Sequence, residues 1–95
     1  DFEEPDLDRF PCLGLAYSAL RTGGTMPAVL NGANEIAVQA FLDGNIRLSE
    51  IAAINRAVMD EHEARPADSL EAILETDTWA RSRAIMKLSK TVAAN

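Results

Sequence analysis

The polar residues with the most chemical information lie in the middle of the most hydrophobic stretch of the chain. Residues 31–35 read Asn-Gly-Ala-Asn-Glu. Asn and Gly are poor helix-interior residues, so their presence in a predicted helix needs a compensating reason. Asn31, Asn34 and Glu35 are three and four positions apart and share one helix face. Amide side chains can pair with the backbone of another segment, and Gly32 would let that segment come close. We interpret this face as a contact with another domain or a linker; the alternatives are a helix kink or an ordinary surface strip.

No other group of residues suggests a reactive site. His62 is the only histidine. It lies in the charged run 60–63, where consecutive side chains point in different directions, so we expect it to be solvated rather than a metal ligand. Cys12 lies in the first turn of a predicted helix, a position that can activate a thiol, but its apolar neighbours favour packing. Residues 23–25 lack the Lys-Ser/Thr pair of a phosphate loop and are predicted to form a turn. We therefore expect no catalytic, cofactor-binding or metal-binding residue in this chain.

Composition excludes several classes of protein. With 95 residues, of which 47% are hydrophobic, the chain fits one small globular domain. No apolar run reaches the ~18 residues that a membrane-spanning helix needs. The net charge of −6 argues against general binding to nucleic acid or anionic lipid. One cysteine cannot form an internal disulfide or a thiolate zinc site, and a reducing, cytoplasmic setting fits it.

Hydrophobic periodicity predicts an all-α fold, a small helical bundle of four main helices and one short helix. The sequence gives start and stop signals for each helix. The first helix is expected from Pro11 to Gly23-Gly24, and the second over about 27–43. The third is expected to follow an N-cap at Ser49 and to end at the polar run 60–65. A short helix capped by Asp68 comes next, and the last helix, capped by Asp77, is expected from Thr78 to about Ala93.

The same periodicity predicts which residues face the core. The second helix is apolar on more than one side and is expected to be central, while Trp79 is expected to cover one end of the bundle. The predicted core residues are Leu13, Ala16, Tyr17 and Leu20 in the first helix, Val29, Leu30, Ala33, Ile36, Ala37, Ala40 and Phe41 in the second, Ile51, Ile54, Val58 and Met59 in the third, and Ile85, Leu88 and Val92 in the last.

The first ten residues differ from the rest. Residues 1–10 contain five acidic residues and one arginine, a charge of −4, with Pro5 among them. We interpret them as an extended acidic linker that precedes a helical bundle over residues 11–95, with aromatic residues able to anchor on a neighbouring surface. The alternative is a frayed chain end.

Three segments have a distinctive sequence: Phe-Pro-Cys-Leu at residues 10–13, the run Pro-Ala-Val-Leu-Asn-Gly-Ala-Asn-Glu that opens residues 27–42, and Ile-Arg-Leu-Ser-Glu-Ile at residues 46–51. Together they resemble the C-terminal part of the 1-deoxy-D-xylulose 5-phosphate reductoisomerases. Residues 5–10 are similar to that family's linker into its C-terminal bundle. Gly32 stands where Ala is more usual in the family.

The resemblance implies the C-terminal domain of an enzyme that converts 1-deoxy-D-xylulose 5-phosphate to 2-C-methyl-D-erythritol 4-phosphate in non-mevalonate isoprenoid biosynthesis. NADPH and Mg or Mn are expected for the full-length enzyme, bound by its nucleotide-binding and catalytic domains. It also implies a homodimer and a cytoplasmic setting in bacteria, the favoured source, or a plastid in plants. The role that transfers to this chain is structural: Arg9, Phe10, Pro11, Asn31, Asn34 and Glu35 would hold the linker and the bundle against the catalytic domain.

Two interpretations of the function follow. In the first, the chain is a structural domain that supports the catalytic domain and is inactive alone. In the second, it is a free-standing helical protein-interaction module whose acidic arm binds a basic partner. The start of the chain would separate them, because a free-standing protein is expected to begin with Met or a processed terminus.

Overall fold

The computed structural model describes residues 10–94, and side chains up to residue 93. Four helices make up the fold: α1 (Pro11–Thr22), α2 (Met26–Leu42), α3 (Leu48–Asp60) and α4 (Leu70–Ala94). No strand occurs among the described residues, which confirms the predicted all-α class. The predicted acidic linker, apart from Phe10, lies outside the described residues. No helix of the described part is long and apolar enough to cross a membrane.

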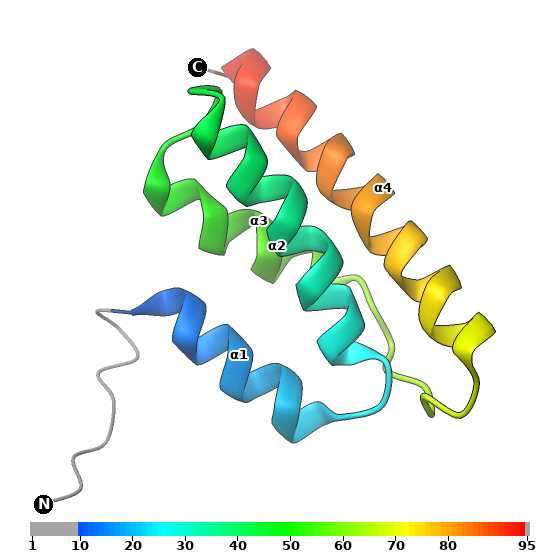
Figure 1. The fold of residues 1–95 in the computed structure, drawn as a ribbon. Helices are drawn as coiled ribbons and strands as arrows, with labels where there is room; N and C mark the ends of the chain where they lie inside the picture. Colours follow the sequence, from blue (N-terminus) through cyan, green and yellow to red (C-terminus); the bar gives the residue numbers. More distant parts are fainter. Residues whose placement is uncertain (1–9, 95) are drawn as a thin grey trace, which may run out of the picture.

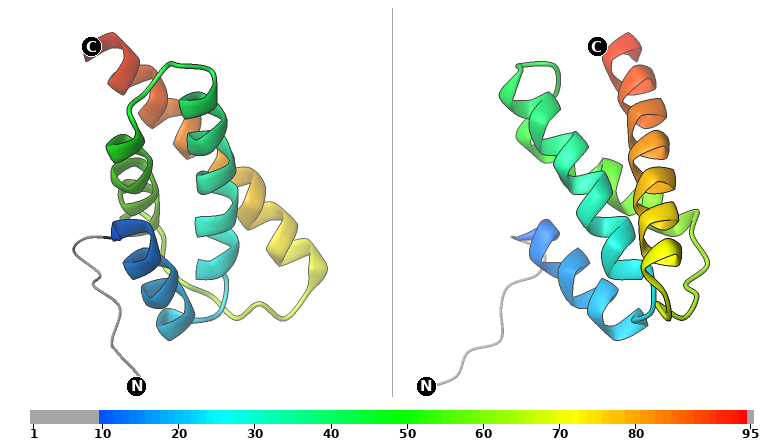
Figure 2. Two further views of the ribbon diagram at one scale, coloured as in Figure 1. Left: turned by 60° about the vertical axis from the view of Figure 1, so that its left-hand side comes forward. Right: turned by 45° about the vertical axis from the view of Figure 1, so that its right-hand side comes forward.

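Helix α2 is the centre of the bundle. It contacts α1, α3 and α4, whereas α1 and α4 share no contact within the described part of the chain. Figure 1 shows α1 and α4 on opposite sides of α2, and the right-hand view of Figure 2 shows the same order. The prediction that the second helix is central is therefore confirmed.

Small residues let α2 and α4 approach closely. Ala80 and Ala84 of α4 are fully buried. A Cβ atom added to Gly32 would lie 3.0 Å from Asp77 Oδ1 and 3.4 Å from the Cβ of Ala80. The glycine in the interior of α2 is thus explained by close packing against α4 of the same domain, which compensates for its poor helix propensity.

Helix α4 replaces the two helices that were predicted for the C-terminal region. Asp77 was expected to start a new helix, but it lies inside α4 and bonds to Arg81 one turn later, at 2.9 Å. The predicted cap at Asp68 is also wrong, because Ser69 Oγ accepts the Ala72 N–H at 3.1 Å. No Gly or Pro occurs between Leu70 and Ala94, so nothing in the backbone interrupts the helix.

Helix α3 starts earlier than predicted. It begins at Leu48 and not after Ser49. The reason is a backbone contact: the Arg47 N–H donates to Glu50 Oε1 at 2.7 Å, so the glutamate side chain satisfies an amide of the helix start. The other predicted ends agree with the structure, including the stops at Gly23 and Gly44, which both have positive φ.

The predicted core is correct for α2 and α3, wrong for α1, and correct in α4 only for Leu88, which is partly buried against the core. In α1 the buried residues are Leu15 and Ala19, whereas Leu13, Tyr17 and Leu20 are exposed. In α4 the buried residues are alanines, and Ile85 and Val92 are exposed. The close approach of α4 to α2 requires small side chains at the contact. Of the larger apolar residues of α4, Trp79 and Leu88 are partly buried against the core, whereas Ile85 and Val92 lie elsewhere. The full core consists of Leu15, Ala19, Met26, Val29, Ala33, Ala37, Ala40, Ile46, Ile51, Ile54, Val58, Met59, Ala80 and Ala84.

The loop between α3 and α4 is tied to the start of α2. The Thr25 N–H donates to the Arg65 carbonyl at 2.9 Å. Gly24 precedes this contact with φ +56°, and a Cβ atom there would overlap the Arg65 carbonyl oxygen. Figure 1 shows the loop passing the first turn of α2 before it reaches α4.

Gly24→Ala is expected to destabilise the domain more than Gly44→Ala. Both glycines have positive φ, which costs an L-residue about 1–2 kcal/mol, but Gly44 has open space around it. The Gly24 variant must also displace the Arg65 backbone. Urea unfolding of both variants measures the difference. Equal losses of unfolding free energy would show that the loop yields without cost.

Candidate interdomain surface

A hydrogen-bonded pair of asparagines, of which Asn55 is buried and Asn34 half-buried, joins α2 to α3. Asn55 is 1% exposed, and its Nδ2 donates to Asn34 Oδ1 at 2.9 Å. The other polar atom of the Asn55 side chain, Oδ1, is buried and has no hydrogen-bond partner in the described part of the chain. A buried acceptor without a donor costs about 1–3 kcal/mol, so this atom is an unusual feature of a small domain.

A groove lies above this pair, between α1, α2 and α3. Its volume is about 370 Å³. Among the described residues, its lining is apolar apart from three amide side chains and one thiol, and includes no charged residue. The lining residues are Cys12, Ala16, Ala19, Leu20, Pro27, Leu30, Asn31, Asn34 and Asn55. Cys12 was expected to be packed among its neighbours, but its thiol is exposed at the groove.

An apolar stripe on α1 continues from the groove. Leu13, Tyr17 and Leu20 are spaced at i, i+4 and i+7, and they are 38%, 41% and 70% exposed. The sequence pattern predicted that this face is buried, and the bundle itself does not bury it. Phe10 and Pro11, which precede the stripe, are also exposed. This end of the molecule therefore presents a contiguous run of apolar side chains along one helix.

The residues predicted for interdomain contact fall into different places. Asn31 and Asn34 both line the groove. Glu35 instead turns to α4, where it forms an ion pair with Arg81. The hydrogen bonds that Arg81 donates to Asp77 and, to a lesser extent, to Glu35 raise the pKa of Arg81. Arg9 lies outside the described residues.

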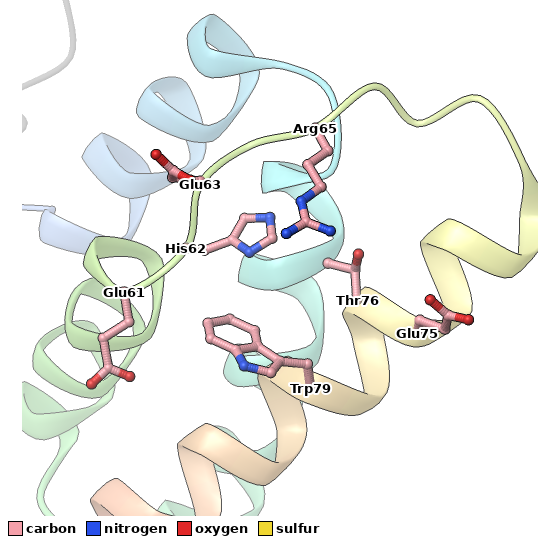
Figure 3. Close-up of a pocket in the computed structure, with 7 residues that line it drawn as sticks. All are labelled: Glu61, His62, Glu63, Arg65, Glu75, Thr76 and Trp79. Carbon is pink, nitrogen blue, oxygen red and sulfur yellow. The ribbon is translucent and has the colours of Figure 1, made fainter.

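A second hollow lies between α4 and the loop after α3. Figure 3 shows Trp79 and His62 facing each other across it, and their ring centroids are 5.2 Å apart. The hollow has a volume of about 520 Å³ and is lined by Glu61, His62, Glu63, Arg65, Glu75, Thr76 and Trp79. Trp79 therefore packs at the side of this loop.

The expectation that His62 is a solvated surface residue is wrong. His62 is half-buried, and its Nε2 lies 2.8 Å from Thr25 Oγ1. The same hydroxyl accepts the Arg65 N–H at 3.0 Å, so it can donate its own proton to a neutral His62. Burial, and to a lesser extent the charge of Arg65, lowers the pKa of His62. The imidazole thus fastens the loop to α2 and has a structural role.

A salt-bridge cluster next to this hollow ties α3 to α4. Glu61, at the end of α3, forms ion pairs with Arg83 at 2.8 Å and with Lys87. The hydrogen bonds from Lys87 and then Arg83 lower the pKa of Glu61. These groups are partly exposed, so their contribution to stability is small. Among residues 10–93, no group of three or more His, Cys, Asp or Glu side chains could hold a metal ion.

Comparison with known proteins identifies the domain. The family model described as the DXP reductoisomerase C-terminal domain matches residues 1–83. The chain belongs to this family. The similarity is high: a 1-deoxy-D-xylulose 5-phosphate reductoisomerase of Trichlorobacter lovleyi is 57% identical over 83 residues, which are 87% of this chain and 21% of that protein. One of Cupriavidus taiwanensis is 54% identical over 93 residues, which are 98% of this chain and 24% of that protein.

A solved structure of a reductoisomerase supports the same family assignment. The 1-deoxy-D-xylulose 5-phosphate reductoisomerase of Zymomonas mobilis in complex with NADPH superposes with a TM-score of 0.84 and 44% identity, over 93% of this chain and 23% of that one. The chain thus spans about a quarter or less of the reductoisomerases it matches. Family membership does not favour the alternative interpretation, a free-standing interaction module.

Asn55 is the residue of this surface that the sequence pattern could have revealed. It lies four residues after Ile51 and three before Val58, so it is a single polar residue within the buried stripe of α3. The exposure of the α1 stripe carried no such signal, because an apolar face has the same pattern whether its partner lies inside or outside the domain.

Thr25→Val is expected to lower the free energy of unfolding by about 1–3 kcal/mol, because His62 Nε2 and the Arg65 amide both lose their partner. The isosteric change keeps the packing of the buried side chain. Thr78→Val is the control: this threonine is exposed on α4 and should change stability by less than about 0.5 kcal/mol. Thermal and urea unfolding measure both. A near-neutral Thr25→Val would contradict the role given to the hydroxyl.

Stability is expected to fall as the pH decreases below the ordinary His pKa of about 6.5. Because the pKa of His62 is lowered in the folded state, the unfolded chain binds the proton more readily between the two pKa values. Urea unfolding at about pH 7.5 and about pH 5.5 stays above the range where most carboxylates titrate. His62→Gln should reduce the difference in unfolding free energy between the two pH values. If this difference is unchanged, groups other than His62 cause the pH dependence.

Proposed function

We propose that this chain is the C-terminal domain of an enzyme that converts 1-deoxy-D-xylulose 5-phosphate to 2-C-methyl-D-erythritol 4-phosphate with NADPH. The observation that carries the proposal is the family match over residues 1–83 of a chain that covers only 21% to 24% of the relatives cited. The NADPH complex of the Zymomonas mobilis enzyme supports the choice of NADPH as the cofactor. By the same resemblance, the enzyme is a homodimer in a bacterial cytoplasm and uses Mg or Mn.

Within that enzyme the domain's role is to support the catalytic domain. The reaction needs groups that bind phosphate, a nicotinamide and a metal ion. The described residues offer no metal cluster, and the groove has no cation for a phosphate. By the family resemblance, the metal and NADPH would be held by the other domains. What this chain supplies is apolar surface: burial of the α1 stripe against the catalytic domain would limit the relative motion of the two.

The division of the chain follows from this role. Residues 1–10 link the catalytic domain to the bundle, which comprises residues 11–95. The contacts that hold the linker and the bundle against the catalytic domain come from Arg9, Phe10, Pro11, Asn31, Asn34 and Glu35. Exposure of Pro11 and Asn31 in the described structure supports their availability for such contacts.

The full-length enzyme with Leu13→Asp and Tyr17→Asp is expected to oxidise NADPH at least tenfold more slowly with 1-deoxy-D-xylulose 5-phosphate as substrate. Two carboxylates placed in a buried apolar contact must lose their water, and ~1.4 kcal/mol already corresponds to tenfold. Leu42→Asp is the control, since Leu42 is exposed at the far end of α2 and lies outside the groove.

The outcomes separate the two parts of the proposal. Full activity in the α1 double variant would refute the supporting role of the stripe. Absence of substrate-dependent NADPH oxidation in the unmodified full-length enzyme would refute the proposed reaction. Circular dichroism of the 95-residue chain with the same two changes checks that the bundle still folds, because both side chains are exposed in it.

A further inference from the structure

One residue that lines the groove between α1, α2 and α3 has a buried acceptor atom that lacks a hydrogen-bond donor among the described residues. Asn55 is 1% exposed, and its Oδ1 has no partner in the described part of the chain. Its Nδ2 is already committed to Asn34. The groove lies directly over this side chain. An occupant that donates an N–H to Oδ1 would remove a cost that the isolated bundle carries.

The lining excludes several kinds of occupant. Both NADPH and 1-deoxy-D-xylulose 5-phosphate carry phosphate groups, which proteins bind most strongly with cationic side chains, and none of the described residues that line the groove is charged. Its volume of about 370 Å³ is at the small end of the range for small-molecule sites, ~300–1,000 Å³. An uncharged occupant with apolar side chains and a free amide fits the lining best, and a stretch of polypeptide has this chemistry.

We propose that the groove binds an uncharged segment from the catalytic part of the same polypeptide, which donates an N–H to Asn55 Oδ1 and lays an apolar side chain between α1 and α2. The inference rests on the proposed function and adds to it the contact that sets the position of the bundle. More than three quarters of the relatives' length lies outside this chain, so the segment has an ample source. The α1 stripe continues from the groove and extends the same contact.

Cys12 provides a probe of occupancy, because it is the only cysteine of the chain, is exposed and lines the groove. Its rate of alkylation by iodoacetamide can be followed by peptide mass spectrometry. In the full-length enzyme the rate is expected to be at least tenfold lower than in the 95-residue chain. Asn31→Arg places a long charged side chain at the groove and should restore fast alkylation in the full-length enzyme.

Gln39→Arg is the matched control for Asn31→Arg. Both residues are exposed on α2, but Gln39 does not line the groove and contacts Asp43, which an arginine can also pair with. This variant should leave Cys12 protected. Asn55→Leu adds a test of the donor: it should destabilise the bundle more in the full-length enzyme than in the 95-residue chain. Equal losses would indicate that a bound water, rather than a protein donor, satisfies Oδ1, and would overturn the proposal.

Three further results would overturn it. Equal alkylation rates in the full-length enzyme and the 95-residue chain would mean that the groove is open in the enzyme. Slow alkylation of the 95-residue chain that accelerates on dilution would make a second copy the occupant. Slow alkylation at all concentrations, relieved by Phe2→Ala and Leu7→Ala, would make the acidic arm the occupant. The proposed reaction does not depend on these rates, because it is tested by NADPH oxidation of the unmodified enzyme.

Discussion

The close contact between α2 and α4 determines the rest of the architecture. Gly32, Ala80 and Ala84 bring the two helices together, so α4 covers one side of α2 without large side chains between them. Glu35 is drawn to the same side by Arg81. What remains of α2 must then be covered by α1 and α3. The groove forms where these two helices and α2 meet, and the polar residues Asn31 and Asn34 lie along it.

The position of α1 follows from this arrangement. It contacts α2 and α3 and has no contact with α4 in the described residues. It buries only Leu15 and Ala19 in the bundle, and most of its apolar surface is exposed. A small domain gains little free energy from such a helix, since the hydrophobic contribution is roughly proportional to buried apolar area. The stability of α1 is therefore expected to depend on a neighbouring surface, and this accords with a domain that evolved as part of a longer chain.

Periodicity in the sequence was sufficient to predict the class, the first three helices and the core of α2 and α3. It failed where packing or tertiary hydrogen bonds overrode a local signal. Asp77 has the residue type of an N-cap, but an ion pair with Arg81 keeps it inside a continuous helix. His62 lies in a charged run, and only the fold brings Thr25 and Trp79 to it across 37 and 17 positions of sequence. The groove could be predicted only in part. Asn31 and Asn34 were found from their type and spacing, and Asn55 interrupts the buried stripe of α3, whereas Cys12 joins them only once α1 is packed.

An unpaired buried acceptor on a residue that lines an apolar groove has a different consequence from apolar surface alone. Apolar contacts are non-directional, so the stripe on α1 could be buried against a partner in several orientations at similar free energy. An unpaired acceptor allows far fewer arrangements, because any orientation that leaves Asn55 Oδ1 buried without a donor keeps the full desolvation cost. The bond to Asn34 also fixes the Asn55 amide, so the direction of the acceptor is set before docking. For a domain whose proposed task is to hold a catalytic domain in one position, the stripe would provide affinity, and the asparagine pair would select the orientation.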